Sequence, residues 1–165
     1  MLMFQNAKWI RHAAPVQENE YADFKATFTV KNTANAVVRI SSETDYLLFI
    51  HGKEIAYGQY HDLKTYKVYD EIPLDGVLQT GENELLITAY FEHTDTASYT
   101  EKGSGLLFEI VCDGERVLSS GKHVQSRRSP FYKSGTNVPL ITGQLGYSYE
   151  YDFGGGFSSS DYAPS

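Results

Sequence analysis

The sequence predicts an all-β protein, an antiparallel β-sandwich of the jelly-roll type. Apolar residues recur with a period of two along most of the chain, rather than with the 3.6-residue period of a helix. Turn residues divide these runs into about eight to ten strands. No segment shows an amphipathic helix of three turns. We expect residues 1–153 to form the sandwich and "GGGFSSSDYAPS" (154–165) to be a flexible, linker-like tail.

The first clear strand is "DFKATFTV", which we expect to be half-buried and antiparallel. One face carries Phe24, Ala26, Phe28 and Val30, and the other carries Lys25, Thr27 and Thr29. The segment "AVVRIS" (36–41) repeats this pattern more weakly. Upstream, Trp9 is expected to anchor the first strand to the sandwich.

Two segments are apolar on both faces, as central strands of a sandwich are: "DYLLFIH" (45–51) and "ELLITAYFE" (84–92). After the first, His51-Gly52 predicts a hairpin turn, because glycine accepts the left-handed backbone conformation and histidine tolerates it. Before the second, we expect one short helical turn at Asp75 to Leu78, and a chain reversal at Gly81-Glu82-Asn83.

The segment "GLLFEIVCDGERVLSS" predicts a hairpin of two apolar strands around Asp113-Gly114. Cys112 is the single cysteine, so it has no internal disulfide partner, and we interpret it as a buried, inert thiol. The last predicted strand is "LGYSYEYDF" (145–153). We interpret its aromatic stripe as part of the core; it consists of Tyr147, Tyr149, Tyr151 and Phe153.

The charge of the chain argues against nucleic acid as a partner. The formal net charge is -7, and the only basic run is Arg127-Arg128, whereas phosphate binding needs clustered Lys and Arg. No apolar stretch approaches the roughly 18 residues of a membrane span, so no membrane partner is predicted. "MLMFQNAKWIRH" is too short and polar for a signal peptide. We expect a cytoplasmic protein, or a secreted one whose signal peptide has been removed.

The common catalytic motifs are missing, and we predict no catalytic residue. Gly-x-Ser-x-Gly, Cys-x-x-Cys, His-Glu-x-x-His and a phosphate-binding glycine loop do not occur. Carboxylates are plentiful, but nothing selects two of them as the pair that glycoside hydrolysis needs. The histidines are scattered singly, which favours surface or turn positions over a metal site: His12, His51, His61, His93 and His123.

A cluster of aromatic and polar residues around positions 57–66 is the candidate carbohydrate-binding site. Sugars stack their C–H faces on aromatic rings, while neighbouring polar side chains bind the hydroxyls. The candidate residues are Tyr57, Tyr60, His61, Asp62 and Tyr66. The alternative stays open that Tyr57 and Tyr66 close the sandwich edge and that the others are only solvated.

Five segments carry a family resemblance: "AKWI", "ISSETDYLLFIHGKEIAYGQY", "YKVYDEIPLDGVLQTGENELLITAYF", "GSGLLFEIVCDGERVLSS" and "GQLGYSYEYDF". They resemble the N-terminal β-sandwich region, a galactose-binding-like domain, of bacterial α-L-rhamnosidases of glycoside hydrolase family 78. The resemblance covers roughly residues 7–153. The matching residues are Gly52-Lys53, Tyr69-Asp70, Leu74, Leu78 and Gly81-Glu82-Asn83. The chain departs from the family at His51, where the family usually has Asn.

The resemblance implies that the catalytic acid and base lie on a downstream (α/α)₆ barrel, so this chain would be a non-catalytic accessory fragment. It would support the barrel and contact glycan, and its tail would mark where the chain is cut. Three alternatives stay open: an autonomous carbohydrate-binding module, the sugar-binding sandwich of a β-galactosidase-like enzyme, which shares this pattern, and a purely structural domain. No cofactor is predicted. Some family sandwiches bind rhamnose through calcium, but this sequence has no Asp-Asn pair to hold it.

Overall fold

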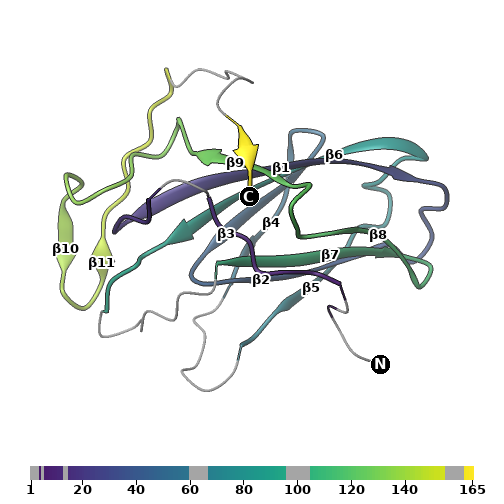
Figure 1. Ribbon diagram of the computed structural model, residues 1–165, viewed down its shortest axis with the longest axis horizontal. Coiled ribbons are helices and arrows are strands. Elements are labelled where there is room, and N and C mark those ends of the chain that lie inside the picture. Colours follow the sequence, from purple (N-terminus) through teal and green to yellow (C-terminus); the bar gives the residue numbers. More distant parts are fainter. Residues whose placement is uncertain (1–3, 5, 13–14, 60–66, 96–104, 155–161) are drawn as a thin grey trace.

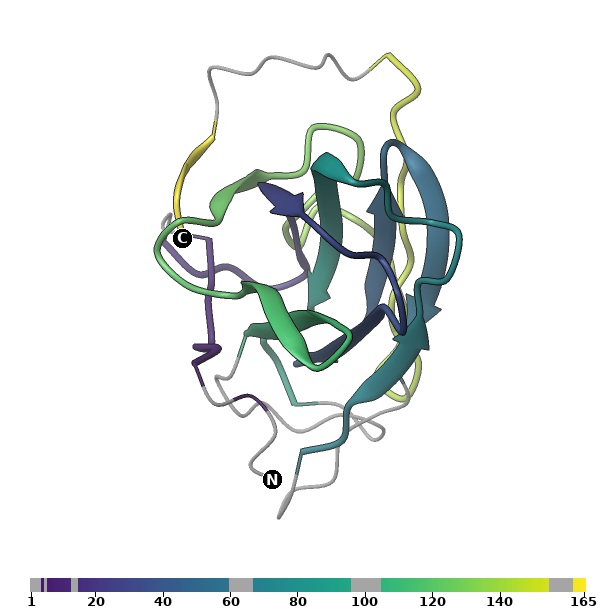
Figure 2. The ribbon, with the colours of Figure 1, turned by 90° about the vertical axis from the view of Figure 1, so that its right-hand side faces the viewer.

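The protein is a sandwich of two antiparallel β-sheets, as the computed structural model shows (Figures 1 and 2). It describes residues 4, 6–12, 15–59, 67–95, 105–154 and 162–165. Every element in the described part of the chain is a strand, so the predicted all-β fold class is confirmed. Among these residues no helix is long and apolar enough to cross a membrane.

The larger sheet has six strands, and each of its neighbours is antiparallel. In spatial order they are β12 (Ala163–Pro164), β9 (Gln125–Arg128), β1 (Glu20–Val30), β6 (Gly81–Phe91), β3 (Tyr46–Ile50) and β4 (Lys53–Gly58). The two longest strands, β1 and β6, pair in register along their whole length, from Glu20 opposite Phe91 to Val30 opposite Gly81.

The second sheet has four strands, and a separate pair lies at one end of the molecule (Figure 1). The four are, in spatial order, β5 (Asp70–Pro73), β2 (Val37–Ser42), β7 (Leu106–Cys112) and β8 (Glu115–Ser119). The separate pair is β10 (Leu140–Thr142) with β11 (Gly146–Tyr147). We call residues 140–153, which include this pair, the arm.

The core lies between the two sheets and is filled by the inward side chains of each strand. The large sheet contributes Phe24, Leu48 and Ile87, and the small sheet contributes Ile40 and Phe108, all fully buried. Burying a side chain of this size contributes roughly 1.5–3 kcal/mol. The predicted faces of the first strand are confirmed, because Phe24, Ala26, Phe28 and Val30 are buried while Thr27 and Thr29 are exposed.

Both predicted hairpins are confirmed, and in both the turn residues take the left-handed backbone conformation. Asp113 and Gly114 have φ angles of 49° and 80° between β7 and β8, where Cys112 is buried as expected. His51 and Gly52 have φ angles of 51° and 73° between β3 and β4. A type I′ turn needs positive φ at both positions, which explains why β-branched residues are absent there.

The hairpin turn at His51 is joined to the start of β6 by side-chain hydrogen bonds. His51 Nε2 lies 3.0 Å from Asn83 Oδ1, which also accepts a hydrogen bond from the Gln79 amide at 3.0 Å. The Asn83 amide nitrogen donates to the carbonyl oxygens of Gln79 and Gly81, at 2.8 and 3.0 Å. Asn83 is fully buried. The Gly-Glu-Asn motif and the hairpin turn therefore belong to one architectural unit.

Three interpretations of the aromatic and N-terminal residues need correction. The stripe at 145–153 is not core, because Tyr149, Tyr151 and Phe153 are 71%, 41% and 93% exposed. Only Gly146–Tyr147 of this segment is a strand. Trp9 is 39% exposed, and it is Ile10, buried and bridged to Leu106, that fixes the N-terminal segment.

The helical turn expected near Asp75 is a hydrogen-bonded turn, in which the Val77 amide donates to the Leu74 carbonyl oxygen. The reversal expected at 81–83 is instead the start of β6. At the C-terminus, β12 pairs with β9, and the Ser165 amide donates to the Val124 carbonyl oxygen at 3.0 Å. Residues 155–161 lie outside the described residues, and the domain boundary at residue 153 stays a prediction.

Candidate functional site

A groove of about 800 Å³ lies on the outer face of the six-stranded sheet, opposite the core. This volume is within the usual range of small-molecule sites, about 300–1,000 Å³. Its floor comes from outward side chains of four adjacent strands, and its wall from Tyr132 and the arm. The side chains that line it include Tyr21, Tyr57, Tyr90, Tyr132, Tyr147 and Tyr149, with Asp45 and Glu92.

Strand register brings the floor residues together. Tyr21 of β1 lies opposite Tyr90 of β6, and their rings stack with centroids 4.6 Å apart. Tyr132 stacks on the other side of Tyr21, at 4.7 Å and an interplanar angle of 14°. The next outward row places Leu47 of β3 between Thr88 of β6 and Tyr57 of β4. Aromatic rings therefore cover the floor at one end of the groove.

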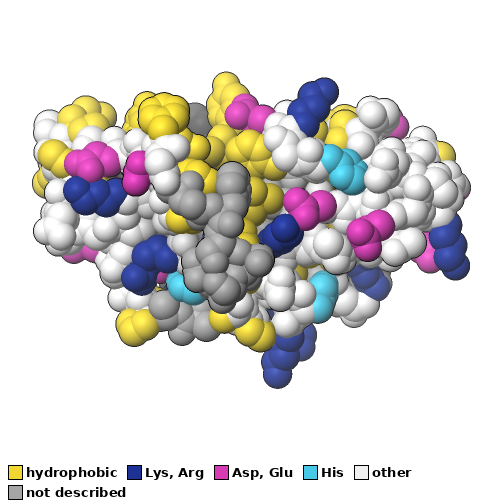
Figure 3. All heavy atoms as spheres, turned by 90° about the horizontal axis from the view of Figure 1, so that it is seen from above, with side chains coloured by type: hydrophobic (Ala, Val, Ile, Leu, Met, Phe, Trp, Pro, Cys, Tyr) yellow, Lys and Arg dark blue, Asp and Glu magenta, His cyan; other side chains and the backbone are white. Residues whose placement is uncertain are grey.

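The arm forms the wall of the groove together with Tyr132. Tyr147, Tyr149 and Leu145 line the groove, and Leu145 and Tyr149 are also largely exposed to solvent. Figure 3 views the molecule from above, with hydrophobic side chains gathered on its left half and along its centre. The exposed aromatic stripe of the sequence thus forms a boundary of the groove.

The end of the groove near β4 is fixed by buried polar contacts. Gln59 forms two hydrogen bonds with the backbone of Ser42, of 2.9 and 2.7 Å. The Tyr46 hydroxyl donates to Asp70 Oδ2 at 2.6 Å. A side chain at Gly58 would collide with this pair, since its Cβ would lie 2.9 Å from the Tyr46 hydroxyl. Glycine at position 58 is therefore required by close packing.

The tyrosines of the groove are neutral at physiological pH, since tyrosine ordinarily ionises near pH 10. Burial is the main cause of the raised pKa values of Tyr21, Tyr90, Tyr132 and Tyr147, with neighbouring tyrosines and carboxylates adding to it. Their hydroxyls can consequently donate and accept hydrogen bonds at physiological pH. Burial also raises the pKa of Glu92, and the charge of Asp45 raises it further.

A buried ion pair supports the floor from the neighbouring row. Arg127 Nε lies 3.2 Å from Asp23 Oδ2, and the Thr88 hydroxyl donates to Asp23 Oδ1 at 2.8 Å. The ring of Tyr162 lies 4.5 Å from the Arg127 guanidinium carbon. Burial raises the pKa of Asp23, against the opposing effects of the Thr88 hydrogen bond and the Arg127 charge.

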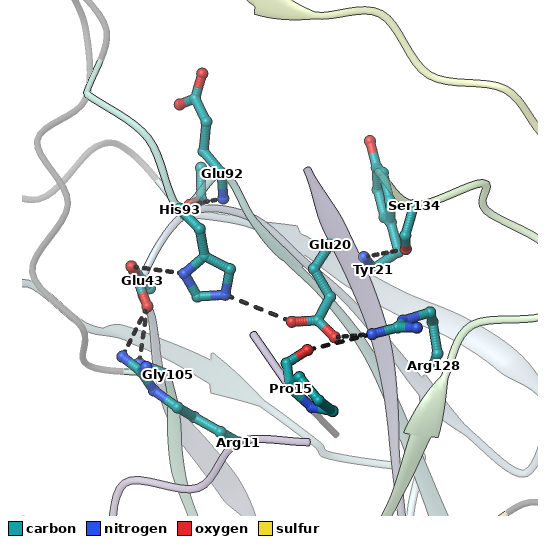
Figure 4. A network of polar contacts seen from close by, with 11 residues as sticks. Arg11, Pro15, Glu20, Tyr21, Glu43, Glu92, His93, Gly105, Arg128 and Ser134 are labelled. Carbon is teal, nitrogen blue, oxygen red and sulfur yellow. Dashed lines mark hydrogen bonds and ion pairs between the residues drawn. The ribbon is translucent and has the colours of Figure 1, made fainter. Parts of the chain in front are cut away.

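A second polar network lies around the His93 ring (Figure 4). The His93 ring is held between Glu20 Oε2, 3.5 Å from Nε2, and Glu43 Oε1, 3.7 Å from Nδ1. Arg11 and Arg128 lie 3.4 Å from these two carboxylates. The interpretation of every histidine as a surface or turn residue is thus wrong for the His93 side chain, which is 3% exposed. Among the described residues no cluster of His, Cys, Asp and Glu is placed to hold a metal ion.

Of the sequence-predicted site residues, the structure places one beside the groove. Tyr57 is 79% exposed and lines it. Tyr60, His61, Asp62 and Tyr66 lie outside the described residues, so the predicted site stays a prediction.

Four residues of the groove were not predicted from the sequence as site residues: Tyr21, Tyr90, Asp45 and Glu92. The sequence does contain an indication that Tyr21 and Tyr90 belong to a site. The alternation of each strand places its tyrosine on the outward face, where Lys or Thr is more usual. The register that makes them neighbours is not visible in the sequence.

The chain is similar to solved structures of family 78 rhamnosidases. It superimposes on the GH78 rhamnosidase of Bacillus sp. GL1 with a TM-score of 0.86 at 21% sequence identity, covering 96% of this chain and 18% of that one. For the α-L-rhamnosidase of Aspergillus terreus the TM-score is 0.65 at 16% identity, with 98% and 21% covered. The chain thus spans about a fifth of the length of these enzymes.

The fold is also similar to that of a fungal lectin. For the lectin of Pleurotus ostreatus in complex with GalNAc, the TM-score is 0.53 at 18% identity, covering 96% of this chain and 44% of the lectin. No protein-family model and no curated protein matches the sequence. The chain therefore shares its fold with a segment of GH78 α-L-rhamnosidases and, less closely, with a lectin.

Proposed function

We propose that this chain is a non-catalytic accessory β-sandwich of a rhamnosidase-like glycoside hydrolase, and that its tyrosine-lined groove contacts glycan. The groove on the outer face of the large sheet is the observation that carries the glycan role. Exposed tyrosine rings such as Tyr57 and Tyr149 offer stacking surfaces for the C–H faces of a sugar. Neutral tyrosine hydroxyls and the carboxylates of Asp45 and Glu92 can bind its hydroxyl groups.

Similarity to a segment of much longer rhamnosidases supports the accessory role. The arm also supports contact with a neighbouring domain. It exposes a group of large apolar side chains, and exposed apolar groups of this kind mark surfaces that bind another protein or domain. These side chains are Leu140, Ile141, Leu145, Tyr149 and Phe153, each more than half exposed.

The glycan role is tested by titrating the chain with L-rhamnose, galactose and their glycosides while following tyrosine fluorescence and calorimetric heat. We expect saturable binding that Tyr57→Ala and Tyr149→Ala each weaken by about 1–2 kcal/mol, the worth of one stacking contact. Phe153→Ala is the matched control, since Phe153 is the most exposed aromatic residue described here but does not line the groove. Absence of binding, or equal losses in all three variants, would overturn the glycan role.

The non-catalytic role is tested separately with nitrophenyl rhamnoside. Asp45 and Glu92 are two carboxylates in one groove, so turnover by the chain itself is a pertinent alternative. We expect no release of nitrophenol, and release that Glu92→Gln abolishes would show that the chain is an enzyme.

The lectin similarity favours an autonomous sugar-binding module as the second candidate. Such a module binds sugar with the same affinity alone and when joined to a catalytic domain. A domain that completes a neighbouring enzyme's site binds more weakly alone.

A further inference from the structure

The tyrosines of the groove differ in what they offer to a ligand. Both faces of the Tyr21 ring are covered, by Tyr90 at 4.6 Å and by Tyr132 at 4.7 Å, so this stack presents its hydroxyl edge. Tyr57 and Tyr149 also line the groove, but they are 79% and 71% exposed. A sugar can therefore stack its C–H face on these two rings, and it meets hydroxyl groups on the floor.

Tyr57 and Tyr149 lie on opposite sides of the groove. Tyr57 belongs to β4, at one edge of the large sheet. The arm that carries Tyr149 is held on the β1 side, because the Lys133 amide donates to the Glu150 carbonyl oxygen at 3.0 Å. The charge of Tyr149 also contributes to the raised pKa of Tyr21 on β1, so the two side chains are neighbours. β6 and β3 lie between the two sides.

The width of the sheet sets the distance that a ligand must span. β1 and β4 are three strand spacings apart. At about 4.8 Å each, these spacings amount to about 14 Å. Side chains stand roughly perpendicular to a sheet, so Tyr57 stays above its own strand. A pyranose ring is about as long as one strand spacing, so a single sugar cannot reach Tyr57 and Tyr149 together.

We propose that the groove binds an oligosaccharide of at least two linked sugars, with one sugar ring stacked on Tyr57 and another on Tyr149. This inference rests on the proposed function and names the class of glycan. Once one sugar is stacked, the second contact forms within the same complex, so affinity rises with the length of the chain. The Tyr90 hydroxyl and the Glu92 carboxylate line the floor between the two rings, where they can bind sugar hydroxyls.

A length series tests the proposal. Oligosaccharides of α-linked rhamnose and of β-linked galactose, with one, two and three units, are titrated into the chain by calorimetry. A second stacking contact is worth about tenfold in affinity, so we expect the three-unit sugar to bind at least about tenfold more tightly than the monosaccharide. A site with one stacking ring would gain only the statistical factor of having several sugar rings to choose from.

Variants assign the length dependence to the two rings. Tyr57→Ala and Tyr149→Ala should each reduce it to the statistical factor, because only one stacking ring is left. A monosaccharide uses one side at a time, so each variant weakens it less than it weakens the three-unit sugar. Tyr57→Phe and Tyr149→Phe keep the ring and should keep the length dependence. Phe153→Ala is the matched control, because Phe153 is exposed but does not line the groove. Circular dichroism melting curves establish that each variant is folded.

The outcomes separate this inference from the proposed function. If neither series binds and the wider sugar panel fails as well, the glycan role is wrong and the inference falls with it. If a sugar of the panel binds but no oligosaccharide binds more tightly than the monosaccharide, the groove contacts glycan as a site for one sugar, and the inference is wrong. A length dependence that survives in both alanine variants also contradicts it.

Discussion

Replacing Arg127 by methionine is expected to destabilise the protein strongly, because it removes the countercharge of a buried carboxylate. Arg127 and Asp23 are both 2% exposed, and their side chains lie on adjacent strands of the large sheet. Methionine fills much of the same volume, so loss of packing is small. The Asp23 carboxylate keeps its hydrogen bond from Thr88 but loses its ionic partner.

The magnitude follows from burial. Removing one partner of a buried ion pair costs about 3–5 kcal/mol, whereas an exposed pair contributes about 0–1 kcal/mol. Lys25→Met is the matched control, since Lys25 pairs with Glu84 at 2.8 Å across β1 and β6 of the same sheet, with side chains 36% and 46% exposed. The Arg127→Met variant also loses the contact with the Tyr162 ring, which adds about 0.5–2 kcal/mol to its loss of stability and has no counterpart in Lys25→Met.

Urea unfolding followed by circular dichroism measures both variants. The pH dependence gives a second readout. Burial already raises the pKa of Asp23 and loss of Arg127 raises it further, so the folded variant binds a proton more tightly than its unfolded chain. The Arg127→Met protein should therefore recover stability relative to the wild type as the pH falls from neutral toward 3.8, the ordinary pKa of an aspartate. Equal losses in the two variants, or a pH-independent deficit, would refute the reasoning.

Three further predictions concern single residues. Burial and Asp45 raise the pKa of Glu92, so its proton stabilises the folded state below the unfolded pKa of 4.5, and this contribution is lost as the pH rises through the folded pKa. Glu92→Gln is accordingly expected to raise Tm near pH 7, with a gain that shrinks toward pH 4; a constant difference across this range would contradict it. Gly58→Ala is expected to cost about 1–3 kcal/mol in chemical denaturation, because its Cβ would lie 2.5 Å from Asp70 Oδ2, and an unchanged midpoint would show that the neighbours yield. Cys112 is 3% exposed and burial raises the pKa of its thiol, so a disulfide reagent should react with it only after unfolding in guanidinium; rapid reaction of the native protein would rule out an inert thiol.

Local signals account for what the sequence predicted correctly. Period-two alternation is a property of one strand, so the buried face of β1 could be predicted without knowing its neighbours. Turn residues act locally as well, and both hairpins have their left-handed residues at the expected positions, His51-Gly52 and Asp113-Gly114. The same logic failed at Tyr149 and Phe153, because alternation tells which residues share a face but not whether another element covers that face.

The groove could not be predicted, since it depends on contacts between distant segments. Tyr21 and Tyr90 become neighbours only through the register of β1 and β6, and Tyr132 joins them from a loop. The burial of the His93 ring likewise depends on Glu20 and Glu43, which come from different elements. Tyr57 was selected because its aromatic and polar neighbours are close in the sequence, and the strand that carries it borders the groove.

The contact between His51 and Asn83 has a consequence for engineering chimeras of such domains. A hairpin tip transplanted alone from another scaffold would bring a different partner to the Asn83 amide oxygen, and loss of that hydrogen bond costs about 0.5–1.5 kcal/mol. Donor segments for positions 51–52 and 79–83 should consequently be exchanged together, as a single cassette.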